Sequence, residues 1–340
     1  MKNYIKILKA ECGDAIVIHY IGNDGKPHNI FIDSGYSITY IEQVKPEIER
    51  IIQDGEKIDL WIITHIDDDH IGGIIDFIKD DDYDIDLVNQ FWFNWSQYGY
   101  TIPKDDGFVN VEQGKDLREY LKSINKLSQD DITNETEPIN LFGAIFTILS
   151  PNKKSLQKLK KVWGAKEKIK VISENNILVS NCAYDNDIKL EVLAKNKFTQ
   201  DSSPPNGSSI AFTLTIEETS FLFLGDSFPK VITSSLKDNP VEIDYVKLSH
   251  HGSKKNTNEK LISLINCKNY IISCDGENKH CLPNKETFAK IILNKNNKDK
   301  LLNFYFNYKN ERLVNMFLED DAKNINSIFL DDLEENKIKF

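Results

Sequence analysis

The chain has 340 residues, with 42 basic and 53 acidic side chains, a net charge of −11 and 40% hydrophobic residues. This composition is typical of a globular protein in water and excludes a broad basic surface for nucleic acid, so such a substrate would have to be held locally. The sequence lacks the ~20 consecutive apolar residues of a membrane span, and residues 1–6 do not resemble a secretory signal. We therefore expect a cytoplasmic protein without a membrane segment.

The first part of the chain predicts a sheet. Asn23-Asp24-Gly25 is typical of a tight hairpin turn between two strands. The pattern of residues 41–52 predicts a helix. Strands are expected where apolar residues run or alternate between turn signals, at residues 4–8, 15–20, 29–32 and 60–63.

The segment after the strand at 60–63 carries two histidines and three aspartates, in the order Thr64-His65-Ile66-Asp67-Asp68-Asp69-His70-Ile71-Gly72-Gly73. A turn from a strand into a helix directs such side chains toward one point, where burying them without a partner costs free energy. A bound metal ion would explain the cluster. An acidic helix N-cap with incidental histidines is the alternative, which a histidine on either side of the aspartates disfavours.

Two further segments admit two interpretations each. The aromatic segment at residues 91–95 is either core or a base-stacking wall, and the core interpretation is favoured. A helix at 153–170 is rich in lysine and is either a phosphate-binding surface or a solvated helix, which the overall acidity favours. Another helix is expected at 113–127. Later strands are expected at residues 144–149, 188–193, 208–216, 221–224 and 270–273, and residues 301–308, 312–318 and 328–330 are expected to close a second sheet.

Polar residues follow these later strands. Asp226 ends the strand at 221–224, and His250 and His251 come after another predicted strand. Adjacent histidines on a loop point in different directions, so one of them can face a metal site while the other packs or hydrogen-bonds. Candidate substrate-binding residues nearby offer amide, hydroxyl and ammonium groups to a phosphate: Asn206, Ser208, Ser253, Lys254 and Lys255.

The segment from His65 to His70 resembles the His-x-His-x-Asp-His motif of the metallo-β-lactamase fold. Asp67 stands where most of that superfamily has its second histidine. This departure, together with Ser-His-His-Gly-Ser at 249–253, is similar to the branch that contains the soluble domain of the ComEC/Rec2 DNA-uptake proteins.

The resemblance implies an α/β fold, an αββα sandwich of two mixed sheets flanked by helices. It implies one domain over residues 1–340, with insertions at 79–140 and 152–200. It also implies that Asp33 supports the metal ligands through hydrogen bonds, and that Asn206 occupies the place of a missing third-motif histidine. The implied metal ligands are His65, Asp67, Asp69, His70, Asp226, which would bridge two ions, and His280.

Charge favours an anionic substrate. Two divalent ions carry +4, and Asp67, Asp69 and Asp226 offset three of these charges. The carboxylate at Asp67 moves the preference toward Mn²⁺ or Mg²⁺, with Zn²⁺ possible. We therefore expect a two-metal phosphodiesterase, most simply a nuclease that uses a metal-bridging hydroxide.

The expected catalytic residues are Asp69, His250 and His251, with one of the two histidines protonating the leaving oxygen. Hydrolysis of a small phosphodiester or an ester is the alternative among enzymes. A catalytically quiet binding or scaffold subunit is the alternative outside them, and the missing histidine favours it. The resemblance further implies a bacterial defence system and a protein partner from the same operon.

Overall fold

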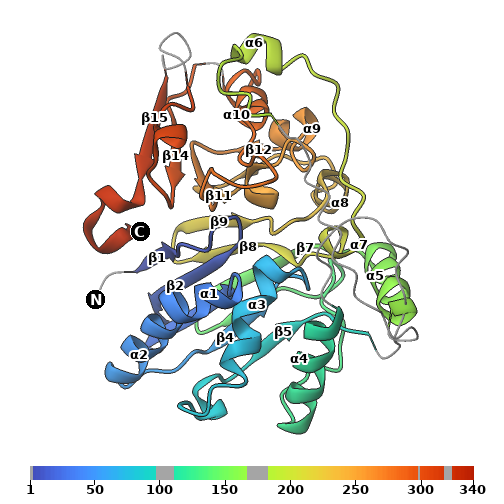
Figure 1. The fold of residues 1–340 in the computed structure, drawn as a ribbon, viewed down its shortest axis with the longest axis vertical. Coiled ribbons are helices and arrows are strands. Elements are labelled where there is room, and N and C mark those ends of the chain that lie inside the picture. The colour runs from blue at the N-terminus through green and yellow to red at the C-terminus, as the bar shows by residue number, and fades with distance from the viewer. Residues whose placement is uncertain (1–2, 97–110, 167–182, 298, 318–323) are drawn as a thin grey trace.

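The computed structural model describes residues 3–96, 111–166, 183–297, 299–317 and 324–340 (Figure 1). Two mixed sheets are flanked by helices, which confirms the predicted fold class. Within the described part, no helix is long and apolar enough to cross a membrane.

The first sheet has the strand order β16-β1-β2-β3-β4-β5. The strands β1, β2 and β3 pair in antiparallel fashion, and the predicted hairpin turn at residues 23–25 joins β2 to β3. The strands β4 and β5 continue the sheet parallel to β3. Pairing of β16 with β1 brings the two ends of the chain side by side (Figure 1). The strands of this first sheet are β1 (Tyr4–Ile7), β2 (Ala15–Ile21), β3 (Pro27–Asp33), β4 (Leu60–Ile63), β5 (Phe91–Phe93) and β16 (Lys337–Lys339).

The second sheet has the order β15-β14-β13-β11-β9-β8-β7-β6, and β10 (Val241–Glu242) pairs separately with β12 (Ile265–Asn266). The strands from β9 to β15 are parallel, whereas β6 to β9 form antiparallel pairs. Its strands are β6 (Ile139–Leu141), β7 (Ala144–Ser150), β8 (Ala211–Ile216), β9 (Thr219–Phe223), β11 (Tyr245–Lys247), β13 (Asn269–Ile272), β14 (Leu302–Phe306) and β15 (Ile325–Phe329).

Helices cover the outer face of each sheet (Figure 1). The α-helices are α1 (Ser37–Thr39), α2 (Lys45–Gln53), α3 (Asp68–Phe77), α4 (Val111–Ser123), α5 (Lys153–Lys166), α6 (Leu190–Leu193), α7 (Pro204–Gly207), α8 (Pro229–Ser235), α9 (Glu259–Ser263), α10 (Lys285–Ile292) and α11 (Glu311–Val314). One π-helical and four 3₁₀ turns are also described: η1 (Tyr40–Val44), η2 (Ile85–Leu87), η3 (Ser249–Gly252), η4 (Leu330–Asp332) and η5 (Glu334–Asn336).

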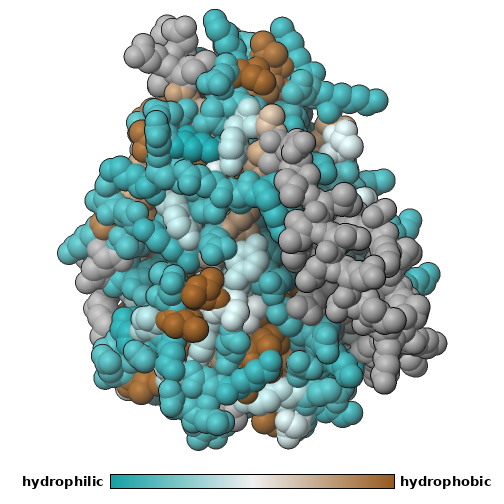
Figure 2. All heavy atoms as spheres, in the orientation of Figure 1, coloured by the Kyte–Doolittle hydropathy of each residue, from teal (hydrophilic) through white to brown (hydrophobic). Residues whose placement is uncertain are grey.

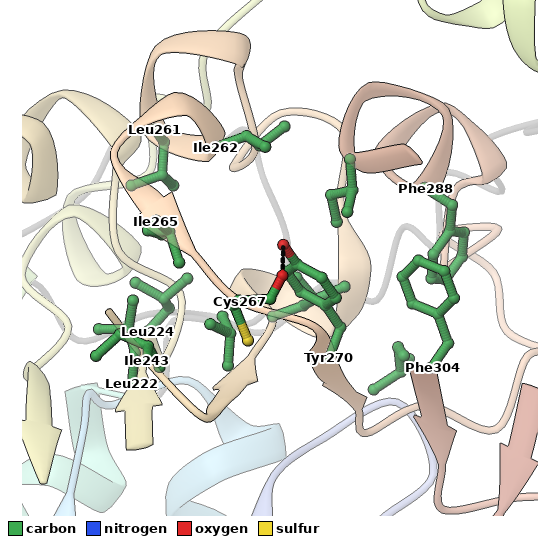
Figure 3. Close-up of a cluster of buried hydrophobic side chains, with 14 of the residues drawn as sticks. Leu222, Leu224, Ile243, Leu261, Ile262, Ile265, Cys267, Tyr270, Phe288 and Phe304 are labelled. Atoms are coloured by element: carbon green, nitrogen blue, oxygen red, sulfur yellow. Dashed lines mark hydrogen bonds between the residues drawn. The ribbon is translucent and has the colours of Figure 1, made fainter. Parts of the chain in front are cut away.

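Three large apolar clusters make up the layers. Alternate residues of β2 face opposite sides, so that Ile16 and Ile18 pack between the sheets while Val17 packs under the helices of the first sheet. The third cluster lies between the second sheet and its helices, where Phe288 of α10 packs on Phe304 of β14 (Figure 3). The outer surface in view is mostly hydrophilic, with small separate apolar patches (Figure 2).

Several predicted elements need correction. Residues 188–193 and 312–318 were expected as strands, but they contain the helices α6 and α11. In both segments the buried apolar residues are three apart, Leu190 with Leu193 and Leu313 with Met316, which is a helical spacing. The strand β16 was not expected, since the acidic tail shows no apolar alternation. The aromatic residues of β5 are buried, which confirms the core interpretation.

Trp163 of α5 is fully buried and packs on Gly114 of α4 and on Phe93 of β5. We expect Trp163→Ala to lower the free energy of unfolding by about 3–5 kcal/mol, because it removes a large core side chain and leaves a cavity. Lys158→Ala, on the exposed face of the same helix, should change it by less than about 0.5 kcal/mol. Urea unfolding of both variants measures the difference, and equal midpoints would contradict the packing.

Candidate metal centre

The candidate centre lies at the carboxyl ends of strands from both sheets. His65 follows β4 of the first sheet, whereas Asp226 follows β9 and His250 follows β11 of the second. Because β9 and β11 are parallel neighbours, their carboxyl ends meet at one edge of the sheet. In α/β folds, ligands bind outside this edge.

The start of helix α3 supplies the other candidate ligands. Asp67 is the N-cap residue, and Asp69 and His70 lie in the first turn. The helix sits close to the loop after β3: the Gly73 amide donates to the Gly35 carbonyl at 2.9 Å, and a Cβ on Gly73 would collide with the Ser34 carbonyl. The glycine therefore permits this close approach of the two backbones.

One set of donor atoms gathers around His70. Its Nε2 atom lies 3.6 Å from Asp69 Oδ2 and 3.6 Å from Asp226 Oδ1. The Nε2 atom of His251 lies 3.2 Å from Asp69 Oδ2 and 4.0 Å from Asp226 Oδ1. Atoms that share one ion at about 2.0–2.2 Å lie at comparable separations from each other.

A second set gathers around the other oxygen of Asp226. Asp226 Oδ2 lies 3.8 Å from His65 Nε2 and 3.6 Å from His250 Nε2. Asp67 Oδ2 lies 3.6 Å from His65 Nε2. The carboxylate of Asp226 thus stands between the two sets and presents one oxygen to each.

The donor atoms fit a metal ion because many of them are buried without a partner. Among the described residues, five buried atoms at this centre form no hydrogen bond: His65 Nε2, His70 Nε2, Asp67 Oδ1, Asp226 Oδ1 and Asn206 Oδ1. An unpaired buried polar atom costs roughly 1–3 kcal/mol. Three groups of ligand atoms, all sharing His70, lie close enough to hold an ion. His70 is joined by His65 and Asp226 in one group, by Asp69 and His251 in another, and by Asp14 and Asp33 in the third. The His/Asp clusters can therefore bind metal.

Asp33 lies behind this centre. His70 Nδ1 is 2.8 Å from Asp33 Oδ2, and the same carboxylate accepts hydrogen bonds from the amide and the hydroxyl of Thr64, each at 2.7 Å. Such a carboxylate fixes the tautomer and orientation of a ligating histidine. The sequence placed Asp33 in this supporting role.

His250 and His251 are presented by a strained turn. Both residues have positive φ, 49° and 54°, in the left-handed region that non-glycine residues seldom occupy. Such strain costs on the order of 1 kcal/mol or more per residue and is concentrated at functional sites. The turn directs both Nε2 atoms toward Asp226.

Each of these histidines has its own support. His250 Nδ1 lies 3.1 Å from Asn256 Oδ1 and 3.5 Å from Asp201 Oδ2. His251 Nδ1 lies 3.1 Å from the Ser273 carbonyl and 3.3 Å from Asp14 Oδ1, and Asp14 in turn pairs with the buried Lys247. Four of these supporting residues were not predicted in this role: Asp14, Asp201, Lys247 and Asn256. Lys247 and Asn256 lie close to the histidine pair in sequence, and Asp14 follows a turn glycine.

The charged groups of the centre shift the pKa values of one another, and their carboxylates favour bound cations. Burial alone would lower the pKa of His70, but Asp69, Asp33 and Asp226 outweigh it and raise that pKa to about 10. Burial raises the pKa of Asp67, with Asp69 and Asp226 adding to the effect against His65. The pKa of Asp226 is lowered, because the neighbouring histidines outweigh its burial.

Three predicted residues belong to none of the potential metal groups among the described residues: Asp67, His250 and His280. His280 is exposed, and its pKa is lowered mainly by burial, while the charges of His250, Asp69 and His251 also act on it. The ligand role that the resemblance implies for His280 stays a prediction.

The predicted substrate-binding residues fall into two kinds. Ser208 and Ser253 are buried: the Ser208 hydroxyl donates to the Pro205 carbonyl, and the Ser253 hydroxyl accepts from the Lys255 amide. Both hydroxyls thus stabilise local turns. Lys254 lies 3.6 Å from Glu286, whereas Lys255 is exposed. Asn206 is at the centre, and its amide donates to Asp201 at 2.7 Å.

Comparison with known families agrees with this geometry. Residues 15–132, about a third of the chain, match the model of the metallo-beta-lactamase superfamily. The chain carries a metallo-β-lactamase superfamily domain. This is a metal-dependent hydrolase fold, and the match includes His65 to His70 and ends before Asp226. No curated protein matches the sequence. The ComEC/Rec2-like branch, the two insertions and the extent of the domain stay predictions.

Several solved structures are similar to the chain at low sequence identity and low TM-score. A mutant of the CmlA β-hydroxylase is 11% identical with a TM-score of 0.42, over 90% of this chain and 52% of that one, so the chain spans about half its length. The metallo-β-lactamase fold protein YhfI from Bacillus subtilis is 8% identical with a TM-score of 0.42, over 97% and 96%. A diphosphatase of the PhnP family is 13% identical with a TM-score of 0.37, over 80% and 86%.

Metal binding should release protons. Because the pKa of His70 lies near 10 without metal, its imidazole is protonated at neutral pH and must lose that proton to bind an ion. We expect the affinity for Mn²⁺ to rise about tenfold per pH unit between pH 6 and 8 for each proton displaced. Calorimetry in two buffers of different ionisation enthalpy counts the protons. Asp33→Asn should weaken this dependence, and a pH-independent affinity would contradict the assignment.

We expect the ion pair of Asp14 and Lys247 to contribute to the free energy of unfolding through its charges. We expect Lys247→Met to cost about 3–5 kcal/mol of unfolding free energy, because it leaves the buried Asp14 carboxylate without its ammonium partner. Adding Asp14→Asn should recover at least half of that loss. The exposed pair of Lys260 and Asp238 is a control, for which Lys260→Met should cost about 0–1 kcal/mol. Urea unfolding of the double variant decides: equal losses in single and double variants would exclude the charge explanation.

Proposed function

We propose that the protein is a two-metal phosphodiesterase that cleaves nucleic acid. The observation that carries the proposal is the position of Asp226, whose Oδ1 atom lies 3.6 Å from His70 Nε2 and whose Oδ2 atom lies 3.6 Å from His250 Nε2. One carboxylate between two sets of buried donors is the arrangement that a pair of bridged ions requires.

The donors favour particular ions. His65, Asp67 and His250 would hold one ion and Asp69, His70 and His251 the other, with Asp226 shared between them. Four imidazoles favour Mn²⁺ over Mg²⁺, and three carboxylates make the site harder than a thiolate-rich zinc site. We therefore expect Mn²⁺, with Zn²⁺ as the alternative.

Divalent ions held there would supply Lewis acidity, which lowers the pKa of a water and offsets the charge of a phosphoryl oxygen. The chain's own residues fix the geometry for that chemistry. Asp33, Asp14 and Asp201 each orient one histidine. His251 has its two ring nitrogens engaged by Ser273 and Asp69, so it is not available to protonate a leaving oxygen.

His250 is assigned as a ligand in place of the missing third-motif histidine. This weakens the binding-subunit alternative, which rested on that missing donor. His250→Asn should lower the number of Mn²⁺ ions bound from two to one, because it removes a donor from one set only. Metal analysis after gel filtration measures the ratio, and two ions retained by the variant would return His250 to a purely acid–base role.

The nuclease activity is tested with labelled DNA and RNA in Mn²⁺. We expect cleavage by the wild type and a loss of at least 100-fold in Asp226→Asn and in Asp69→Ala with His70→Ala, because ligand loss removes the ions that stabilise the transition state. Asp81→Asn, an exposed carboxylate of the run at residues 80–82, should cleave like the wild type.

If metal-loaded protein cleaves no polymer but hydrolyses bis(p-nitrophenyl) phosphate, the nuclease proposal is wrong and a small phosphodiester is the substrate. If it hydrolyses neither, the phosphodiesterase proposal itself is wrong. The predicted protein partner from the same operon and the defence role stay predictions.

A further inference from the structure

Helix α5 concentrates positive charge in an acidic protein. Its sequence, KKSLQKLKKVWGAK, has lysines at positions 153, 154, 158, 160, 161 and 166 and no aspartate or glutamate. The whole chain carries 53 acidic against 42 basic residues. A solvated helix in such a chain normally mixes both signs on its outer face.

The lysines are sorted around the helix. Leu156, Leu159 and Trp163 are buried and anchor it to the core. On the opposite face, Lys154, Lys158 and Lys161 are exposed at spacings of four and three residues, which places them in one row. None of these three forms an ion pair with another described residue. We call them the α5 lysine row.

The lysines on the flanks of helix α5, unlike those of the α5 lysine row, form ion pairs. Lys153 pairs with Glu135 at 2.6 Å, and Lys160 pairs with Asp131 at 2.6 Å. Acidic residues are therefore available next to α5, and they pair with the flanking lysines. The α5 lysine row is left facing solvent.

The helix is held next to the candidate centre. It packs against α7, which carries Asn206 (Figure 1). Its Trp163 also packs on Gly114 of α4, and the neighbouring Gln113 donates to Asp68 at 2.7 Å, one residue from the ligand Asp69. The α5 lysine row is thus fixed relative to the ligands of both sets.

A further cation lies close to the donors themselves. The Asp201 amide donates to the Lys255 carbonyl at 3.1 Å, and Asp201 also contacts His250. Lys255 is exposed, and its side chain forms no ion pair within the described part of the chain. The backbone of Lys255 therefore lies beside a residue that contacts His250, and its exposed side chain adds a cation on this side of the chain.

We infer that the α5 lysine row binds the phosphate backbone of a nucleic-acid strand whose scissile bond lies at the candidate metal centre. The inference rests on the proposed function and names the surface that holds its nucleic-acid substrate. Lys154 and Lys161 are about 10 Å apart along the helix, which corresponds to roughly three phosphates at 3.4 Å each. Packed helices lie about 8–10 Å apart, so roughly three further nucleotides would span α7.

The test compares a triple variant, Lys154→Gln, Lys158→Gln and Lys161→Gln, with a control of equal charge change. The control, Lys195→Gln, Lys268→Gln and Lys295→Gln, removes three exposed lysines around α6, β13 and α10. Binding of a labelled 30-nucleotide strand with cleavage-resistant phosphorothioate linkages is measured by fluorescence anisotropy in Mn²⁺, between 50 and 200 mM salt. The slope of log affinity against log salt should fall by about 3 in the α5 variant, one per lysine. The control should keep the wild-type slope.

Catalysis gives a second readout. In Mn²⁺, the ratio of kcat/KM on the 30-nucleotide strand to kcat/KM on bis(p-nitrophenyl) phosphate should fall about tenfold in the α5 variant. A dinucleotide is too short to reach α5, so the corresponding ratio for it should not change. Circular dichroism and the urea midpoint check that each triple variant is folded.

The outcomes separate this inference from the proposed function. Equal slopes and ratios in the α5 variant and the control would overturn the docking surface and leave the phosphodiesterase proposal standing. A wild type that hydrolyses the small diester but does not bind the strand at 50 mM salt would overturn it as well. A wild type that binds the strand with a slope dependent on the α5 lysine row, yet cleaves nothing, would support the surface and contradict the proposed function.

Discussion

Three carboxylates and four imidazoles gather at the carboxyl ends of β4, β9 and β11, and the rest of the structure depends on the stability of this cluster. Asp226, His65, His70 and His251 are buried, whereas Asp67, Asp69 and His250 are partly exposed. Like charges in a dry site repel strongly, and desolvation adds to the cost. The direction of the pKa shifts of Asp67 and His70 records this strain. Cations placed between the two sets relieve it, because each donor atom without a hydrogen bond then gains a partner.

The supporting residues make the arrangement specific. His70, His250 and His251 each have a carboxylate behind the ring, at Asp33, Asp201 and Asp14. All three supports come from segments far from their histidine in sequence, and Lys247 pairs with the buried carboxylate of Asp14. Orientation is thereby fixed by contacts across the fold and not by the turns alone.

Much of this was predictable from local patterns. The hairpin at residues 23–25, the buried strand β4 and the cluster from His65 to His70 followed from alternation and spacing. The fold class followed from the resemblance of that cluster to a known motif. The short helices α6 and α11 did not, since segments as short as LEVL and ERLV fit a strand or a helix equally well. The role of His251 could not be read from sequence either. It depends on a left-handed turn after β11 that a linear motif does not encode, and the same motif logic pointed to His280.

The centre also joins the two sheets. His65 to His70 extend from the first sheet, whereas Asp226, His250 and His251 extend from the second. An ion held between them acts as a clamp across the sandwich, so its binding free energy becomes part of the free energy that docks the two halves. At a free ion concentration 100 times the Kd, this linkage is worth about 2.7 kcal/mol per site. The supply of metal would then affect the stability of the folded protein as well as its activity.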